Sequence, residues 1–382
     1  MVQAQRVADC FLQLVRIDSP AREEQEIASF LKDRLEALGA EVFFDDADEA
    51  TGGSVGNLIA RFPGSVDVEP MLLSAHMDTV EPGRGVKPLF ENGFFRSSGD
   101  TILGSDDKSG IAIILEVLQS LKDPSLPHGP IEVVFSVCEE IGLMGAKHLD
   151  KSCLQSRFGY VLDAWDIGKI VTRAPAANRF TFIIRGKESH AGAEPENGIN
   201  AVVLAAKGIA ACPDGRIDHE TTCNIGRIEG GTATNIVPAS AVVHAEARSH
   251  DPEKLKNLTR QMVDAFRQAV EMAVSGSAGL PSLEVSVEED FPHTCIPEDA
   301  PVVLLAKRAA ENLGRTMKTG SVGGGSDANI FFSHGIEACV IGTGMRDVHT
   351  VRENVALADM VACAELLVEM ARVHAGREGS GS

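Results

Sequence analysis

The chain has little basic charge and no long apolar run, and both absences narrow its function. It has 382 residues, with 35 Lys and Arg against 55 Asp and Glu, so its formal net charge is −20. Binding to nucleic acid or to an anionic membrane surface depends on a basic patch, so neither partner is expected. No apolar run reaches the ~18 residues that a membrane-spanning helix needs.

The sequence also lacks the cysteine spacing of a disulfide framework or of a thiolate zinc site. Its eight cysteines lie far apart, and none forms a Cys-x-x-Cys pair. Several stand inside apolar runs, where a free thiol behaves as a small apolar side chain. We therefore expect reduced cysteines and a cytoplasmic protein. The N-terminal residues have no basic flank before an apolar block, which favours an ordinary helix over a signal peptide.

Strands and helices alternate along most of the chain, and its length predicts two domains. Ser19-Pro20 is expected to begin a helix that Gly39 ends, and a closing helix is expected from Asn354. Short apolar strands are predicted between these two helices. The one at 131–137 is apolar almost throughout, which is typical of a sheet covered on both faces.

The pattern changes from about Ala177, where residues 179–187 alternate like a half-exposed antiparallel strand. The order that follows, strand–helix–strand–strand–helix–strand, is that of a ferredoxin-like sandwich. After Pro297 the first pattern returns. We therefore predict an α/β fold with a discontinuous mixed-sheet domain, residues 1–176 and 295–382. Inserted in it is a ferredoxin-like α+β domain, residues 177–294.

Side chains that bind metals collect where apolar strands end or helices begin. They lie in five segments: His76-x-Asp78, Ser105-Asp106-Asp107-Lys108, Glu139-Glu140, Asp163 and Asp347-Val348-His349. In open α/β sheets the ligand site lies at the carboxyl ends of the strands. Two imidazoles with several carboxylates and no thiolate suit Zn²⁺, Mn²⁺ or Co²⁺.

Each segment alone has a simpler interpretation. His-x-Asp after a strand is often a capped turn, Asp-Asp-Lys at a helix start is often capping, and Glu-Glu is often solvated surface. The shared sheet edge favours a metal site, because buried acids would repel one another without a cation. Two metals ~3.5–4 Å apart need a bridging carboxylate, and a further carboxylate must act as general base. The adjacent Glu139 and Glu140 could divide such tasks.

Motifs along nearly the whole chain resemble a known family. SAHMDTV, GSDDKSG, CEEIG, LDAW and DVHT resemble the M20 clan of co-catalytic metallopeptidases. GKESHAGAEPENGINA, GGTATNIVPASAVVHAEARS and GGGSDANIF resemble its peptidase T-like branch, the tripeptide aminopeptidases. The resemblance implies a catalytic domain of the zinc-exopeptidase type and two divalent metal ions. Zn²⁺ is expected first, with Mn²⁺ or Co²⁺ as alternatives.

The resemblance also implies a role for each residue of the metal segments. The implied metal ligands are His76 and Asp163 at one ion, Asp106 between the two ions, and Glu140 and His349 at the second ion. The Asp106–Asp107 peptide is expected to be cis. Asp78 would accept a hydrogen bond from His76 and so orient it. Glu139 would be the general base. It would take a proton from the water molecule between the metals and deliver that proton to the leaving amine.

The inserted domain is implied to be a lid that binds substrate. His190 would stabilise the tetrahedral oxyanion, and Asn235 and Arg248 would bind the peptide, with the guanidinium on its C-terminal carboxylate. The loop Gly324, Gly325 and Ser326 would line the pocket, where small residues admit a substrate backbone. Alone, these would be a surface histidine, a rim salt bridge and a flexible turn. The resemblance leaves open a homodimer through this domain, and whether His190 acts in its own chain or on the neighbouring subunit.

The sequence thus predicts a di-metal hydrolase that cleaves the N-terminal residue from short peptides. An N-acyl amino acid deacylase or a dipeptidase on the same scaffold is the alternative, because the metals and the base would be unchanged. A non-catalytic binding protein is a third hypothesis. The functional side chains present at every expected ligand position, and at Glu139, argue against it. No acidic residue stands out as the anchor for a substrate α-amino group.

Overall fold

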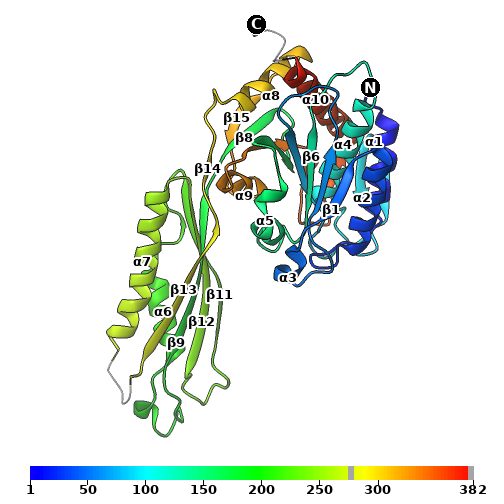
Figure 1. The fold of residues 1–382 in the computed structure, drawn as a ribbon. Coiled ribbons are helices and arrows are strands. Elements are labelled where there is room, and N and C mark those ends of the chain that lie inside the picture. Colours follow the sequence, from blue (N-terminus) through cyan, green and yellow to red (C-terminus); the bar gives the residue numbers. More distant parts are fainter. Residues whose placement is uncertain (274–278, 377–382) are drawn as a thin grey trace. The chain divides into compact units, whose positions relative to one another are not determined.

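The structure is a computed structural model that describes residues 1–273 and 279–376. The chain forms two compact units (Figure 1). The first unit comprises residues 1–173, 295–322 and 326–382, and the second comprises residues 174–294 and 323–325. The predicted fold class is confirmed, because a mixed sheet covered by helices is joined to a separate, smaller α+β unit with an antiparallel sheet.

A nine-stranded mixed sheet forms the centre of the first unit, within the residues that the structure describes. Its strands are β1 (Glu41–Phe44), β2 (Leu58–Phe62), β3 (Met71–His76), β6 (Ile131–Ser136), β7 (Phe158–Ala164), β8 (Lys169–Ala174), β14 (Thr294–Cys295), β15 (Lys318–Ser321) and β16 (Glu337–Gly342). The order is β1-β2-β6-β3-β7-β16-β8-β14, and β15 pairs with β8. The central strand β3 runs parallel to both β6 and β7. The carboxyl ends of these three strands therefore meet at one edge.

Helices cover both faces of this sheet (Figure 1). On one face lie α1 (Ala4–Leu14), α2 (Gln25–Leu38), α4 (Ser105–Leu121), α8 (Pro301–Asn312) and α10 (Leu357–Ala375). The short helices α3 (Ala47–Thr51), α5 (Met144–His148) and α9 (Asp327–Ser333) complete the unit. Strand β3 is buried throughout, with Leu73 in one apolar core and Leu72 in the other. A continuous apolar strand is what burial on both faces requires.

A small four-stranded sheet flanks the main one in the first unit. Its order is β17 (Met345–Arg346), β18 (Asn354–Ala356), β5 (Phe94–Ser97) and β4 (Pro88–Glu91). Strands β17 and β18 lie on either side of the turn that holds His349. The sheet therefore fixes both ends of that turn.

The second unit has the predicted strand and helix order. It consists of β9 (Ala176–Arg185), α6 (Ala201–Ala211), β10 (Gly215–Arg216), β11 (Thr221–Gly230), β12 (Ser240–Ser249), α7 (Pro252–Glu271) and β13 (Ser282–Phe291). The antiparallel sheet has the order β10-β11-β12-β9-β13, which is ferredoxin-like apart from the short β10. Phe182 of β9 stacks on Phe266 of α7 with ring centroids 3.9 Å apart. This aromatic pair lies in the core between sheet and helix.

Two predicted helix starts are wrong. Helix α2 begins at Gln25 and not at Ser19-Pro20, because the Ser19 hydroxyl donates to the Met77 carbonyl at 2.8 Å instead of capping a helix. The closing helix begins at Leu357, because residues 354–356 pair with β5 as strand β18. The predicted end at Gly39 is confirmed, where a φ of 97° suits glycine.

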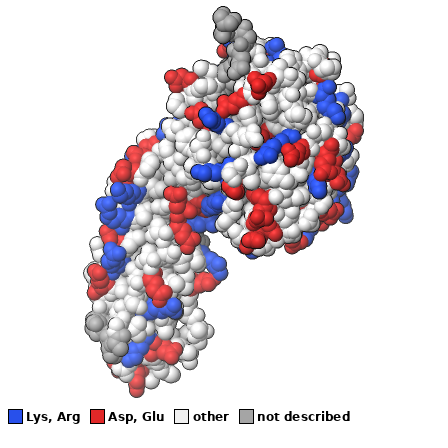
Figure 2. All heavy atoms as spheres, in the orientation of Figure 1, with Lys and Arg blue, Asp and Glu red and all other residues white. Residues whose placement is uncertain are grey.

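The charged residues are mixed in sign on the face that Figure 2 draws. Blue Lys and Arg side chains are interspersed there with red Asp and Glu side chains rather than gathered in one area. Among the described residues, no helix combines the length and the apolar character needed to cross a membrane.

Candidate active site

The metal-binding side chains predicted from the sequence gather at one edge of the large sheet. His76 is the last residue of β3, and Asp163 lies at the end of β7. Glu139 and Glu140 follow the end of β6. Since the three strands are parallel, their carboxyl ends bring these residues together, as the position of ligand sites in α/β sheets predicts.

Asp106 lies between two histidines. Its Oδ1 is 3.0 Å from Nε2 of His76, and its Oδ2 is 3.2 Å from Nε2 of His349. Residues 106 and 107 have non-helical backbone angles, so the regular helix α4 begins after them. The peptide bond between them is cis, as the family resemblance predicts. One carboxylate thus presents one oxygen to each imidazole, which is the arrangement that a ligand shared by two cations requires.

Glu140 completes the contacts around the second histidine. Its Oε1 lies 3.0 Å from Nε2 of His349. One ligand atom each from His76, Asp106 and Glu140 lie within 4.8 Å of one another. Nitrogen and carboxylate oxygen donors at this spacing suit a divalent transition metal or zinc.

The buried acids of this cluster need positive charge. Burial raises the pKa of Asp163 well above its usual value, and the charge of Asp106 raises it further. Burial and neighbouring acidic charges act in the same way on Glu139 and raise its pKa. Hydrogen bonds with Asp106 and Glu140 raise the pKa of the His349 imidazole to about 10. Like charges 4 Å apart repel by about 4 kcal/mol at an effective dielectric constant of 20, so a pair of divalent cations fits these residues.

Asp78 connects two parts of the cluster. Nδ1 of His76 is 2.9 Å from the main-chain oxygen of Asp78 and 3.5 Å from its carboxylate Oδ1. The carboxylate accepts the main-chain N–H of Glu139 at 2.9 Å and that of Glu140 at 3.2 Å. The fully buried Asp78 side chain therefore holds the Glu139–Glu140 turn, and chiefly its main-chain oxygen orients His76.

Glu139 is a buried carboxylate beside the candidate ligands. Its main chain is fixed by Asp78, and its carbonyl accepts the N–H groups of Gly142 and Leu143. Within the part of the chain that the structure describes, no hydrogen bond engages its carboxylate. A buried acid with a raised pKa beside the candidate ligands has the properties of a general base.

His190, in the second unit, has one ring nitrogen free to donate. Its Nδ1 accepts main-chain N–H groups of Gly192 at 3.2 Å and Ala193 at 3.1 Å. Because Nδ1 is an acceptor, the neutral ring holds its proton on Nε2. The main-chain oxygen of Asn235 accepts the N–H of Ala191, which fixes the segment after His190. His190 and Asn235 are both exposed.

Arg248 already has a carboxylate partner. Its Nε and Nη2 donate to the two carboxylate oxygens of Glu246 at 3.1 and 2.9 Å, and its Nη1 donates to the carbonyl of Gly323 at 3.2 Å. The guanidinium also lies over the Phe291 ring, 5.7 Å from its centroid. Three of its five N–H groups are thus used, which leaves two for a ligand.

The glycine loop meets the same two side chains. A Cβ atom on Gly325 would lie 2.7 Å from the Phe291 ring, whereas one on Gly324 would lie 3.9 Å from Arg248 Nη1. Gly325 therefore cannot take a side chain without displacement of the ring. Ser326 belongs to the first unit, is buried, and is the N-cap of α9.

Comparison with known proteins agrees with this geometry. The model of peptidase family M20/M25/M40 matches residues 72–373. The chain belongs to this family. It is therefore an enzyme of the M20 peptidase class, and the predicted membership of the M20 clan is confirmed.

Three relatives of this M20 chain are similar over almost their whole length. The crystal structure of aminopeptidase PepT from Bacillus cereus ATCC 10987 has 41% identity and a TM-score of 0.88, covering 98% of this chain and 99% of that one. A tripeptidase from Staphylococcus aureus subsp. aureus Mu50 has 39% identity and a TM-score of 0.92 with the same coverage. The uncharacterized protein YqjE of Bacillus subtilis (strain 168) is 42% identical over 369 residues, 96% of this chain and 98% of that one.

Two buried acids of this M20 chain, Glu353 and Glu24, were not predicted from the sequence, although both bond to the main chain beside candidate site residues. Glu353 accepts four hydrogen bonds from residues 103–106. Glu24 accepts the main-chain N–H of Cys138 at 3.0 Å, next to Glu139. The only sequence signal for Glu353 is its position shortly after His349, and for Glu24 there is none, because its partner is a main-chain group far away in the sequence.

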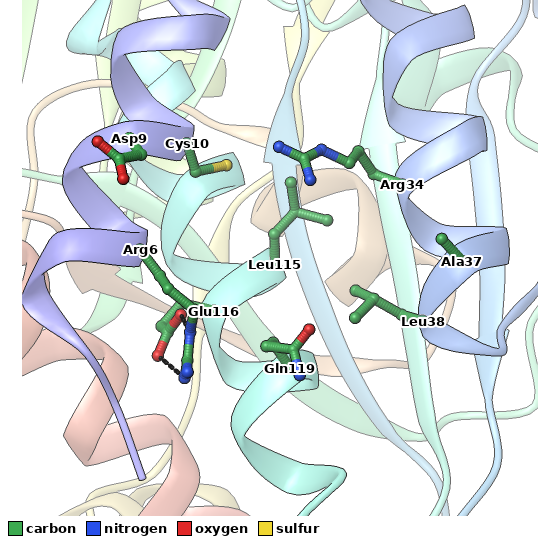
Figure 3. Close-up of a pocket in the computed structure, with 9 residues that line it drawn as sticks. All are labelled: Arg6, Asp9, Cys10, Arg34, Ala37, Leu38, Leu115, Glu116 and Gln119. Atoms are coloured by element: carbon green, nitrogen blue, oxygen red, sulfur yellow. Dashed lines mark hydrogen bonds and ion pairs between the residues drawn. The ribbon is translucent and has the colours of Figure 1, made fainter.

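Two hollows of the first unit lie outside the cluster of candidate metal ligands. One of about 260 Å³ lies between α1, α2 and α4, and Figure 3 shows Arg34 of α2 extending toward Cys10 of α1. On its edge, Arg6 pairs with Glu116 at 2.6 Å. The other, of about 470 Å³, includes Phe158 at the start of β7, the end away from the cluster. Neither is lined by a candidate metal ligand.

Proposed function

We propose that this M20 peptidase is a di-metal aminopeptidase that removes the N-terminal residue from short peptides, tripeptides above all. The single observation that carries the proposal is the Asp106 carboxylate between His76 and His349, with one oxygen toward each. The sequence identities of 41% to an aminopeptidase PepT and 39% to a tripeptidase support the substrate class.

His76, Asp106 and Asp163 would hold one divalent cation, and Asp106, Glu140 and His349 would hold the second. Zinc is the proposed metal, because the donors are imidazole nitrogens and carboxylate oxygens. When bound, such a pair polarises the scissile carbonyl and acidifies a water molecule.

Glu139 would take the proton of the attacking water and return it to the leaving amine. Its burial supports this role, because a raised pKa makes the carboxylate a stronger base that can hold the proton until the amine leaves. His190 would donate its Nε2–H to the oxyanion, either in its own chain or from a second copy. The two N–H bonds that its Nδ1 accepts support that tautomer.

Arg248 would bind the C-terminal carboxylate of the peptide through its two remaining N–H groups. Arg248→Ala is expected to raise KM for free tripeptides about 10- to 100-fold, since a hydrogen bond to a charged group contributes about 1.5–3 kcal/mol. KM for the same peptides with a C-terminal amide should change much less. Steady-state kinetics on both series measure this.

The matched control for Arg248 is Arg185→Ala. Arg185 also lies on the sheet of the second unit and pairs with a glutamate, Glu284, at 3.3 Å. It should leave both KM values near wild type. Equal losses on free and amidated peptides in the Arg248 variant would contradict capture of the carboxylate.

A panel of substrates tests the function itself. Zinc-loaded protein is incubated with dipeptides, tripeptides, N-acetylated tripeptides and N-acyl amino acids, and the products are separated by mass. Release of the first residue from free tripeptides, with little cleavage of N-acetylated ones, is the expected result. Preferred cleavage of N-acyl amino acids would make the protein a deacylase, and preferred cleavage of dipeptides a dipeptidase. No cleavage of any substrate would favour the binding-protein hypothesis.

A further inference from the structure

Glu353 is a buried carboxylate surrounded by hydrogen-bond donors. The residue is only 1% exposed. Oε2 accepts the main-chain N–H groups of Leu103 at 2.7 Å and Gly104 at 2.8 Å. Oε1 accepts the Ser105 hydroxyl at 2.6 Å and the main-chain N–H of Asp106 at 3.0 Å. Four donors therefore satisfy both oxygens of this buried carboxylate.

These four donors precede the regular part of helix α4, which begins after Asp107. Gly104 has a φ of 76°, and residues 106 and 107 are non-helical, so regular helix hydrogen bonds do not hold this segment. Glu353 supplies the missing acceptor. Its hydrogen bond with the N–H of Asp106 acts on the same residue whose carboxylate contacts His76 and His349.

Glu353 is also tied to the turn that holds His349. Its main-chain N–H donates to the carbonyl of Thr350 at 3.0 Å. The next residue, Asn354, begins β18, which pairs with β5. One side chain therefore connects the His349 turn with the Asp106 segment, two parts of the chain that are 247 residues apart.

We infer that Glu353 is a positioning residue that sets the separation of Asp106 and His349, and thereby the affinity for the second metal ion. The inference rests on the proposed function, which supplies the two metal ions. Glu353 touches neither a candidate ligand atom nor the substrate in this role. It acts through the main chain of Asp106 and through the turn after His349.

The variant Glu353→Gln tests this role with almost no change of shape. Three of the four donors are main-chain N–H groups, which cannot reverse and accept. An amide nitrogen would therefore face at least one of them in either orientation of the glutamine. The hydrogen bond with Asp106 is lost if the nitrogen lies at Oε1, and those with Leu103 and Gly104 are lost if it lies at Oε2.

The matched control is Glu132→Gln. Glu132 is 2% exposed, lies on β6 in the same unit, and likewise accepts main-chain N–H groups and a serine hydroxyl. Its partners Gln155 and Ser156 precede β7, at the end of the strand away from Asp163. Loss of a buried acceptor occurs in both variants, but only Glu353→Gln disturbs the metal cluster.

The experiment removes metal from zinc-loaded protein with increasing chelator and counts the ions per chain by native mass spectrometry. In Glu353→Gln, one of the two ions is expected to leave at a chelator concentration about 10- to 100-fold lower than in wild type. This is the usual effect of losing a partner that orients a ligand. Excess Zn²⁺ should restore kcat, with KM near wild type. Glu132→Gln should retain both ions as wild type does.

Three outcomes would overturn the inference. They are unchanged retention of both ions in Glu353→Gln, an equal loss in Glu132→Gln, and a kcat that excess Zn²⁺ does not restore. If Glu353→Gln does not fold, Ser105→Ala is the test variant, because it removes one hydrogen bond and leaves the Glu353 carboxylate in place. It should weaken retention of one ion about fivefold, as one lost hydrogen bond predicts, and no change would refute the role.

The proposed function fails in a different way. Wild-type protein that retains two ions and cleaves no peptide would refute the peptidase activity, while a selective ion loss in Glu353→Gln would still support the positioning role. Active wild-type protein with two ions, together with an unaffected Glu353→Gln, would refute the positioning role alone.

Discussion

Glu139→Ala is expected to retain both metal ions and to lose about 10²- to 10⁴-fold in kcat, the contribution typical of a positioned general base. The main-chain N–H of Glu139, and not its side chain, donates the structural hydrogen bond to the Asp78 carboxylate. Truncation of the side chain therefore removes the base without releasing the turn. Metal content by mass spectrometry and kcat on a tripeptide measure the two effects separately.

One control variant and two contrary outcomes make the Glu139 result specific. Glu132→Gln, a buried acid outside the cluster, should keep near-wild-type kcat. A Glu139→Ala protein with near-wild-type turnover would assign the base to another residue. Loss of metal from the same variant would instead make Glu139 a ligand.

Asp106→Asn is expected to have the second large effect, because one carboxylate contacts both histidines. The amide keeps the shape but offers one acceptor oxygen and no charge, so it cannot serve two cations. The protein should hold at most one ion per chain. Its kcat should fall by more than the roughly 100-fold that loss of an outer partner causes, and excess Zn²⁺ should not restore it.

The control for Asp106 lies near the other end of the same helix. Asp123→Asn changes a carboxylate that accepts the N–H and the hydroxyl of Ser125. It should keep two ions and wild-type activity. Two ions per chain in Asp106→Asn would mean that the metals do not share this carboxylate.

Much of the fold could be predicted because burial leaves a clear pattern. Residues 131–136 are apolar almost throughout, since helices cover both faces of β6. Residues 179–185 alternate, since only one face of β9 packs on α6 and α7. The same pattern predicts where the strands end, and therefore the sheet edge where His76 and Asp163 lie.

Contacts between distant main-chain groups could not be predicted in the same way. Ser19-Pro20 has the composition of a helix start, but Ser19 donates to Met77, and residue type alone does not distinguish the two uses. Three of the four partners of Glu353 are backbone N–H groups, which every residue except proline has. Arg248 and Glu246 are only two residues apart in the sequence, yet their ion pair depends on both side chains lying on the same face of β12.

The side chains around Asp106 come from positions that span most of the polypeptide, from His76 to His349. During synthesis, the turn with His349 and the Glu353 acceptor leave the ribosome after His76, Asp106 and Asp163. A growing chain consequently cannot assemble the complete cluster before the His349 turn has been made, and its hydrolytic power should arise only after that point.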